Sequence, residues 1–155
     1  MGNFLIGSYR ARLDKSGRLK IPEKFRLAIE EKYGKDVVIT SLEGEAIQIY
    51  PLPIWQNISD ITTEGTLPLK PAVKRFHLRM NRFGNHYEID SKGRVLISPI
   101  LRERAKLNEE VEVIGLSNYL EIWDKDLLDK KLEERPLTDQ DFEIISELKP
   151  KGKPE

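Results

Sequence analysis

One nine-residue pattern occurs twice in the chain, and it constrains the fold more than any other feature. The first copy is residues 13–21 (Leu-Asp-Lys-Ser-Gly-Arg-Leu-Lys-Ile) and the second is residues 89–97 (Ile-Asp-Ser-Lys-Gly-Arg-Val-Leu-Ile). Asp, Gly, Arg and the final Ile match at a constant spacing of 76 residues. The repeat predicts two similar halves within 155 residues. Halves of about 70 residues are marginally stable alone, so we expect them to share a core or to oligomerise.

Each copy is typical of a tight turn between two strands. Asp favours the start of a turn, because its side chain can accept a hydrogen bond from the backbone amide two residues on. Gly supplies the positive φ that such a turn usually needs. The residues predicted to fix the turns are Asp14, Gly17, Asp90 and Gly93. Strand periodicity then points Arg18 away from the core when Leu19 faces it, and we expect the same of Arg94.

The rest of each half follows one plan, in which a proline opens a helix and two strands and a trailing helix come after it. The expected strands are 4–13, 37–40, 46–50, 86–89, 111–114 and 119–123. The expected helices begin at Pro22, near Trp55, at 72, at Pro99 and at 125. Residues 59–71 read as a connection, because they contain Thr, Gly and Pro. Each half is therefore predicted to be β-β-α-β-β with a trailing helix.

This plan divides the chain into four parts. Residues 4–62 form a first unit, 63–82 a connecting basic helix, and 83–132 a second unit. Residues 133–155 are an acidic and then Lys- and Pro-rich tail, which we expect to be partly disordered. A helical segment is expected in the tail near Phe142–Leu148, followed by a frayed end.

Positive and negative charges are separated along the chain, although the net charge is zero. Residues 1–35 have an excess of five positive charges, and residues 70–106 an excess of seven. Residues 36–69 and 107–155 have negative excesses of five and seven. Both copies of the repeated pattern lie in the positive segments. A polyanion such as DNA is therefore a plausible partner despite the neutral total, although ordinary solvated surfaces would give the same pattern.

The paired pattern resembles the MraZ family, whose hallmark is Asp-x-x-x-Arg in each half. Here the motifs are residues 14–18 (Asp-Lys-Ser-Gly-Arg) and 90–94 (Asp-Ser-Lys-Gly-Arg). Further similarities are residues 17–22, 50–55 (Tyr-Pro-Leu-Pro-Ile-Trp) and 120–124 (Leu-Glu-Ile-Trp-Asp). One motif alone would be weak evidence. Two motifs at matching positions in the two halves, together with the similar segments at both strand ends, are specific to the family.

The resemblance covers about residues 4–132, and the tail after Glu134 has no counterpart that the sequence alone identifies. It implies a mostly β protein with short helices (α+β). The two units would be AbrB-like swapped hairpins around a pseudo-symmetric, double-psi-like barrel core. It also implies a bacterial transcriptional regulator in the cytoplasm, associated with the nucleoid. Such proteins form ring-shaped oligomers on direct repeats in the promoter of the division and cell-wall gene cluster.

The residue chemistry fits a DNA contact. A guanidinium fork suits phosphate or the major-groove edge of guanine, and a lysine on a turn can reach a phosphate. The predicted DNA-binding residues are Arg18, Arg94, Lys15, Lys92, Arg12 and Lys20. Asp14 and Asp90 are anionic and are expected to orient the turns. The alternative for each signature arginine is a structural salt bridge with its own aspartate.

Other classes of function lack their motifs. The chain has no Cys, and His77 and His86 lack zinc-ligand spacing, so we expect no metal, cofactor or membrane span. Phosphate-binding glycine loops and a serine nucleophile elbow are absent from the sequence, so we expect neither an enzyme nor a small-molecule substrate. The competing hypothesis is a structural ring whose basic turns bind an acidic protein instead of DNA.

Overall fold

The computed structural model describes residues 4–149, and it divides the chain into two units, Met1–Lys125 and Asp126–Glu155. The strands are β1 (Leu5–Arg12), β2 (Arg18–Lys20), β3 (Asp36–Thr40), β4 (Ile47–Pro51), β5 (Asn85–Glu88), β6 (Arg94–Leu96), β7 (Glu110–Ser117) and β8 (Leu120–Asp124). The helices are α1 (Glu23–Tyr33), α2 (Leu52–Thr63), α3 (Pro71–Arg82), α4 (Pro99–Arg104), α5 (Lys125–Glu134) and α6 (Asp139–Ser146), with a 3-10 helix, η1 (Leu67–Leu69), between α2 and α3. The predicted α+β class with two repeated halves is confirmed.

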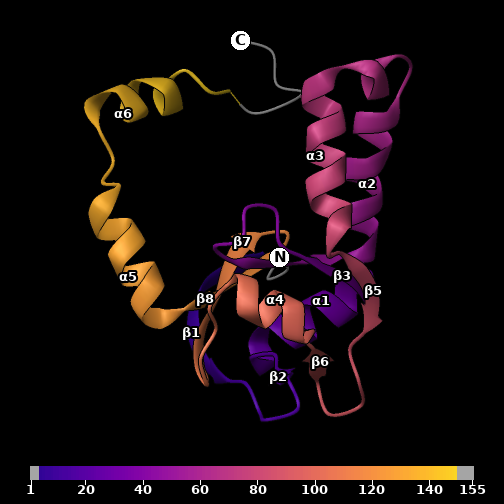
Figure 1. The fold of residues 1–155 in the computed structure, drawn as a ribbon, viewed down its shortest axis with the longest axis vertical. Coiled ribbons are helices and arrows are strands. Elements are labelled where there is room, and N and C mark those ends of the chain that lie inside the picture. The colour runs from indigo at the N-terminus through magenta and orange to yellow at the C-terminus, as the bar shows by residue number, and fades with distance from the viewer. Residues whose placement is uncertain (1–3, 150–155) are drawn as a thin grey trace. The chain divides into compact units, whose positions relative to one another are not determined.

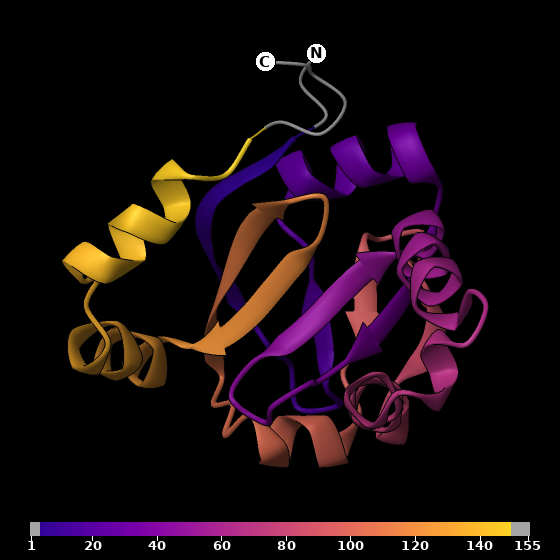
Figure 2. The ribbon, with the colours of Figure 1, turned by 90° about the horizontal axis from the view of Figure 1, so that it is seen from above.

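The main sheet of the first unit is antiparallel and is built from both halves of the chain. Within the described residues it has six strands in the order β1-β7-β8-β4-β3-β5 (Figures 1 and 2). Strand β1 leaves its own half to pair with β7, from Leu5 opposite Ser117 to Arg12 opposite Glu110. Strand β5 makes the reciprocal exchange by pairing with β3. The two halves therefore share one sheet.

A second sheet of two strands joins the segments that follow the two turns. In the part of the chain that the structure describes, the ladder of β2 is with β6, and Leu19 lies opposite Val95 at its centre. The strands flanking each turn consequently belong to different sheets. The expected simple hairpin is reduced in the first half to one bridge, between Leu13 and Leu19. The exchange gives β1 a ladder of eight residue pairs, which a three-residue β2 could not supply.

One apolar cluster fills the space between the sheets and the two short helices. Phe25 and Ile29 of α1, and Leu101 of α4, are buried with Ala105. Pro22 and Pro99 precede or open these helices, as predicted. The Ser98 hydroxyl accepts a hydrogen bond from the Leu101 amide at 3.4 Å. Each buried Leu, Ile or Phe side chain contributes about 1.5–3 kcal/mol relative to an exposed one. The shared cluster explains why neither half needs a core of its own.

A helical hairpin, α2 and α3, extends from the body of the first unit (Figure 1). The basic helix predicted over 72–82 is α3, and its Met80 is buried. The predicted connection over 59–71 is wrong at its start, because α2 continues to Thr63. The hydroxyl groups of Thr62 and Thr63 donate to the helix carbonyls of Ile58 and Ser59, both at 2.7 Å. β-Branched residues lower helix propensity, but these local bonds accommodate them within the last turn.

The second unit contains α6 and nearly all of α5. Helix α5 matches the predicted trailing helix, and α6 is the helix predicted near Phe142–Leu148. Helix α6 begins earlier than expected because Thr138 and Asp141 form a capping box. The predicted frayed end at residues 150–155 lies outside the described residues. Over residues 4–149, no helix combines the length and apolar character needed to cross a membrane.

Candidate nucleic-acid interface

Each repeated turn is organised by its aspartate. The Asp14 carboxylate accepts hydrogen bonds from the backbone amides of Ser16 and Arg18, both at 2.9 Å. Asp90 accepts from the amides of Lys92 and Arg94, at 2.9 and 2.8 Å. The glycines of these turns, Gly17 and Gly93, have φ of +90° and +78°. Both turns lie at the end of the unit away from the α2–α3 hairpin (Figure 1).

These hydrogen bonds favour the ionised carboxylates. The Ser16 hydroxyl, and then the Arg18 amide, lower the pKa of Asp14 below its ordinary value. The Arg94 amide is the largest cause of the lowered pKa of Asp90. Both aspartates are therefore charged at neutral pH, when their role as acceptors holds each turn closed.

The β2–β6 ladder brings the signature arginines of both halves together. Arg18 lies opposite Leu96, and Arg94 lies opposite Lys20. Because side chains alternate across a strand, these four residues share the face opposite to buried Leu19 and Val95. Diagonal neighbours in an antiparallel ladder are roughly 7–8 Å apart, so both arginines lie within the reach of one ligand. We call this surface, made of Arg18, Lys20, Arg94 and Leu96, the ribbon face.

The two signature arginines have different partners. Arg94 Nε donates to Asp90 Oδ2 at 3.1 Å, so the salt-bridge alternative describes Arg94. Arg18 Nη1 instead donates to the Ser16 hydroxyl at 3.0 Å, and among residues 4–149 Arg18 forms no ion pair with a carboxylate. Ser16 lies two residues after Asp14, whereas Lys92 occupies the equivalent place after Asp90. The lysine side chain offers no hydrogen-bond acceptor at that position, so the Arg94 guanidinium donates to the aspartate instead.

The other predicted contact residues lie around this surface. Lys15 and Lys92 are exposed on the turns, and Lys20 is exposed beside Arg94. Arg12 is less available, because it forms an ion pair with Glu109 at 3.2 Å. That pair is mostly exposed, with 73% and 66% of the side-chain surfaces accessible, so a competing anion would displace the glutamate at little cost.

Two further arginines, which the repeated pattern did not single out, lie against the turns. Arg102 of α4 is in contact range of Gly17, and its Nε donates to the Ile97 carbonyl at 3.1 Å. Arg26 of α1 lies against Gly93 in the same way and forms an ion pair with Glu30 at 3.5 Å. Each half thus braces the turn of the other. The signal was present in the sequence, because both arginines follow a signature arginine by eight residues.

Comparison with known proteins identifies relatives over most of the chain. A family model described as "MraZ protein, putative antitoxin-like" matches residues 4–73 and 83–144. The second match continues past Glu134, where the sequence alone showed no counterpart. A protein from Acidobacterium capsulatum is 37% identical over 143 residues, covering 92% of this chain and 97% of its own. One from Koribacter versatilis is 33% identical over 144 residues, with the same coverage.

A third relative, from Caldanaerobacter subterraneus subsp. tengcongensis, is 37% identical over 144 residues, which are 92% of this chain and 94% of that protein. All three carry the name "Transcriptional regulator MraZ". The family model and these relatives cover both copies of the Asp-x-x-Gly-Arg turn. The chain belongs to the MraZ family.

Proposed function

We propose that this protein is an oligomeric transcriptional regulator that binds duplex DNA sequence-specifically through the ribbon face. The observation that carries the proposal is the β2–β6 register, which places exposed Arg18 and half-buried Arg94 on one face with Lys20. Lys15 and Lys92 add positive charge on the flanking turns. A two-stranded ribbon is narrow enough to enter the major groove. The names of the relatives support the regulatory role, and the proposal includes no catalytic step.

The two arginines are assigned different tasks. Among the residues that the structure describes, the Arg18 guanidinium donates only to a serine hydroxyl, so its fork is available for the O6 and N7 atoms of guanine. Arg94 keeps Nε on Asp90, which leaves its terminal amino groups for a phosphate oxygen. Asp90 thereby fixes the direction of Arg94 before DNA binds. The first turn would then contribute more to base discrimination than the second.

Oligomerisation would compensate for the few contacts that one subunit offers. Each neutralised phosphate contributes about −0.9 to the slope of log K against log salt. Roughly four to six contacts per subunit would bind only weakly at physiological salt. A ring of subunits on direct repeats raises the effective concentration of each ribbon face. We therefore propose a homo-oligomeric ring on promoter repeats of the division and cell-wall gene cluster, in the cytoplasm at the nucleoid.

A gel-shift titration on the DNA upstream of the protein's own gene tests the ribbon face. Wild type, Arg18→Ala and Arg94→Ala would be compared at several salt concentrations. Lys24→Ala, which removes an exposed charge from α1, is the matched control. Both arginine variants should weaken binding while circular dichroism shows a folded chain, and Lys24→Ala should not. Wild-type binding that neither arginine variant reduces would contradict the proposal.

The oligomer part needs a separate comparison. A variant that sedimentation shows to be a monomer or a dimer should bind an array of repeats far more weakly than the wild-type assembly does. If it bound a single repeat as tightly as the assembly binds the array, avidity would have no role. Binding of an acidic protein by the intact ring, with no affinity for DNA at low salt, would favour the interaction-ring hypothesis instead.

A further inference from the structure

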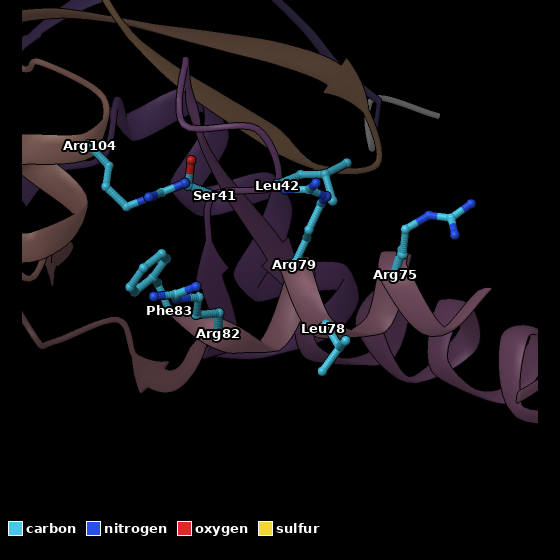
Figure 3. A pocket seen from close by; sticks show the side chains of 8 residues that line it. All are labelled: Ser41, Leu42, Arg75, Leu78, Arg79, Arg82, Phe83 and Arg104. Atoms are coloured by element: carbon cyan, nitrogen blue, oxygen red, sulfur yellow. The ribbon is translucent and has the colours of Figure 1, made fainter. Parts of the chain in front are cut away.

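A second cationic concavity lies where α3 meets α4, separate from the ribbon face. It is a pocket of about 230 Å³ (Figure 3). Its polar wall combines Arg75, Arg79 and Arg82 of α3 with Arg104 of α4 and Ser41 after β3. Figure 3 shows Arg104 and Arg79 extending towards the segment of Ser41 and Leu42 from two sides, while Arg75 points outward at the rim. We call this group the arginine pocket.

Within residues 4–149, the positive charge of the arginine pocket has no protein counterion. In the described part of the chain, none of its four guanidinium groups forms an ion pair or hydrogen bond with a protein acceptor, and no carboxylate lines the pocket. The sequence between Glu64 and Glu88 contains no acidic residue. Glu43 and Glu45, in the neighbouring loop, line a different hollow.

The arginines are held together despite their mutual repulsion. Arg75, Arg79 and Arg82 recur at helical spacing on one face of α3, where like charges four residues apart destabilise a helix by about 0.2–0.5 kcal/mol. The Phe83 ring packs on the core and contacts two arginines of the pocket, Arg82 and Arg104. The guanidinium carbon of Arg104 lies 4.4 Å from the ring centroid, and that of Arg82 lies 5.2 Å away. Cation–π attraction therefore positions both groups before a ligand arrives.

We propose that the arginine pocket binds a phosphate group. A carboxylate offers two oxygens in one plane and saturates one guanidinium fork, whereas phosphate offers more oxygens and more charge. Several forks converging from α3 and α4 match that pattern better. Helix α3 extends from the side of the unit away from the two turns (Figure 1). The pocket is therefore a second anion site, additional to the ribbon face, and its phosphate belongs to a free phosphorylated molecule or to a DNA backbone.

Calorimetric titration of the full chain with inorganic diphosphate tests the pocket. The variants are Arg79→Gln, Arg104→Gln and the double substitution, with Lys24→Gln as the matched loss of one exposed charge. Each pocket variant should raise the Kd about tenfold or more, because a hydrogen bond between charged groups is lost. Lys24→Gln should leave the Kd unchanged. Since all these side chains are exposed, circular dichroism should show every variant folded.

A parallel titration with duplex DNA distinguishes the two sources of phosphate. Diphosphate affinity that falls in the double variant, with duplex affinity unchanged, indicates a free phosphorylated molecule. Duplex affinity and salt slope that fall in the double variant, without diphosphate binding by wild type, indicate a DNA backbone. If the double substitution changes neither titration, the proposal is overturned. Loss of duplex binding in Arg18→Ala alone would leave the pocket proposal standing, because that residue lies on the ribbon face.

Discussion

Replacing Gly17 with Ala tests whether the first turn is built against the second half of the chain. At Gly17 a methyl group would lie 2.8 Å from the backbone oxygen of Ile97, closer than real Cβ atoms approach. The Ile97 amide also donates to the Gly17 carbonyl at 2.8 Å, so the same contact closes the β2–β6 ladder. The substitution should therefore strain the turn and weaken the ladder together.

The expected loss of stability has two parts. An L-residue at positive φ costs about 1–2 kcal/mol, and a weakened ladder hydrogen bond adds about 0.5–1.5 kcal/mol. The sum is about 1.5–3.5 kcal/mol. Gly65→Ala is the control, because Gly65 also has positive φ, +58°, but a methyl group there meets nothing within 4 Å. Gly65→Ala should show only the cost of positive φ. The stabilisation that Gly→Ala gives by lowering the entropy of the unfolded chain applies to both variants.

Urea unfolding of both variants, followed by circular dichroism at neutral pH, measures the difference. Gly17→Ala should lose about 1 kcal/mol more than Gly65→Ala, with similar m-values. Equal losses, within about 0.5 kcal/mol, would refute the idea that the first turn is fixed by the second half. A loss confined to Gly65→Ala would refute it as well.

Three other measurements address the turns, the interface and the tail. The folded state lowers the pKa of Asp14 and of Asp90 below the ordinary value of 3.8, so the stability that they add is present above that pH and falls as the pH drops through the folded pKa. In the double variant Asp14→Asn/Asp90→Asn, the urea midpoint should therefore depend less on pH between about pH 5 and 2 than it does in the wild type. In gel shifts across operator variants, Arg18→Ala should reduce discrimination between sequences, whereas Arg94→Ala should lower affinity uniformly and reduce the salt slope by about one; the reverse pattern would exchange their roles. Thr138→Ala removes the N-cap of α6 and should speed amide exchange in that helix, by an amount matching about 1 kcal/mol, while amides in the six-stranded sheet stay unchanged.

Local patterns in the sequence predicted most elements, because turns and helix starts depend on neighbouring residues. Pro22 and Pro99 marked helix starts, and the Asp-x-x-Gly-Arg pattern marked both turns. The exchange of β1 and β5 between halves came only from the family resemblance, since the residues alone do not say which strand a strand will pair with. The end of α2 was missed because Thr62 and Thr63 resemble a loop until their hydroxyls find helix carbonyls.

The candidate site was only partly predictable for a similar reason. Repetition indicated that Arg18 and Arg94 are equivalent, and the ladder does relate them symmetrically. Their partners differ because Ser16 and Lys92 occupy the same place in the two turns. The arginine pocket depends on α3 meeting α4, and these helices are joined through the second turn and its strands. The charge of residues 70–106 was visible, but its convergence on one hollow was not.

The pairing of β1 with β7 also means that β1 stays unpaired for part of the synthesis of the chain. Strand β1 is made first, yet its partner β7 ends at Ser117, about a hundred residues later. At a translation rate of about 5–20 residues per second, the edge of β1 waits roughly 5–20 s for its partner. During that interval, the β7 strand of another chain, made by a ribosome further along the same mRNA, offers the same pairing edge. Neighbouring ribosomes could thus produce pairs of chains that share a sheet before either chain completes its own.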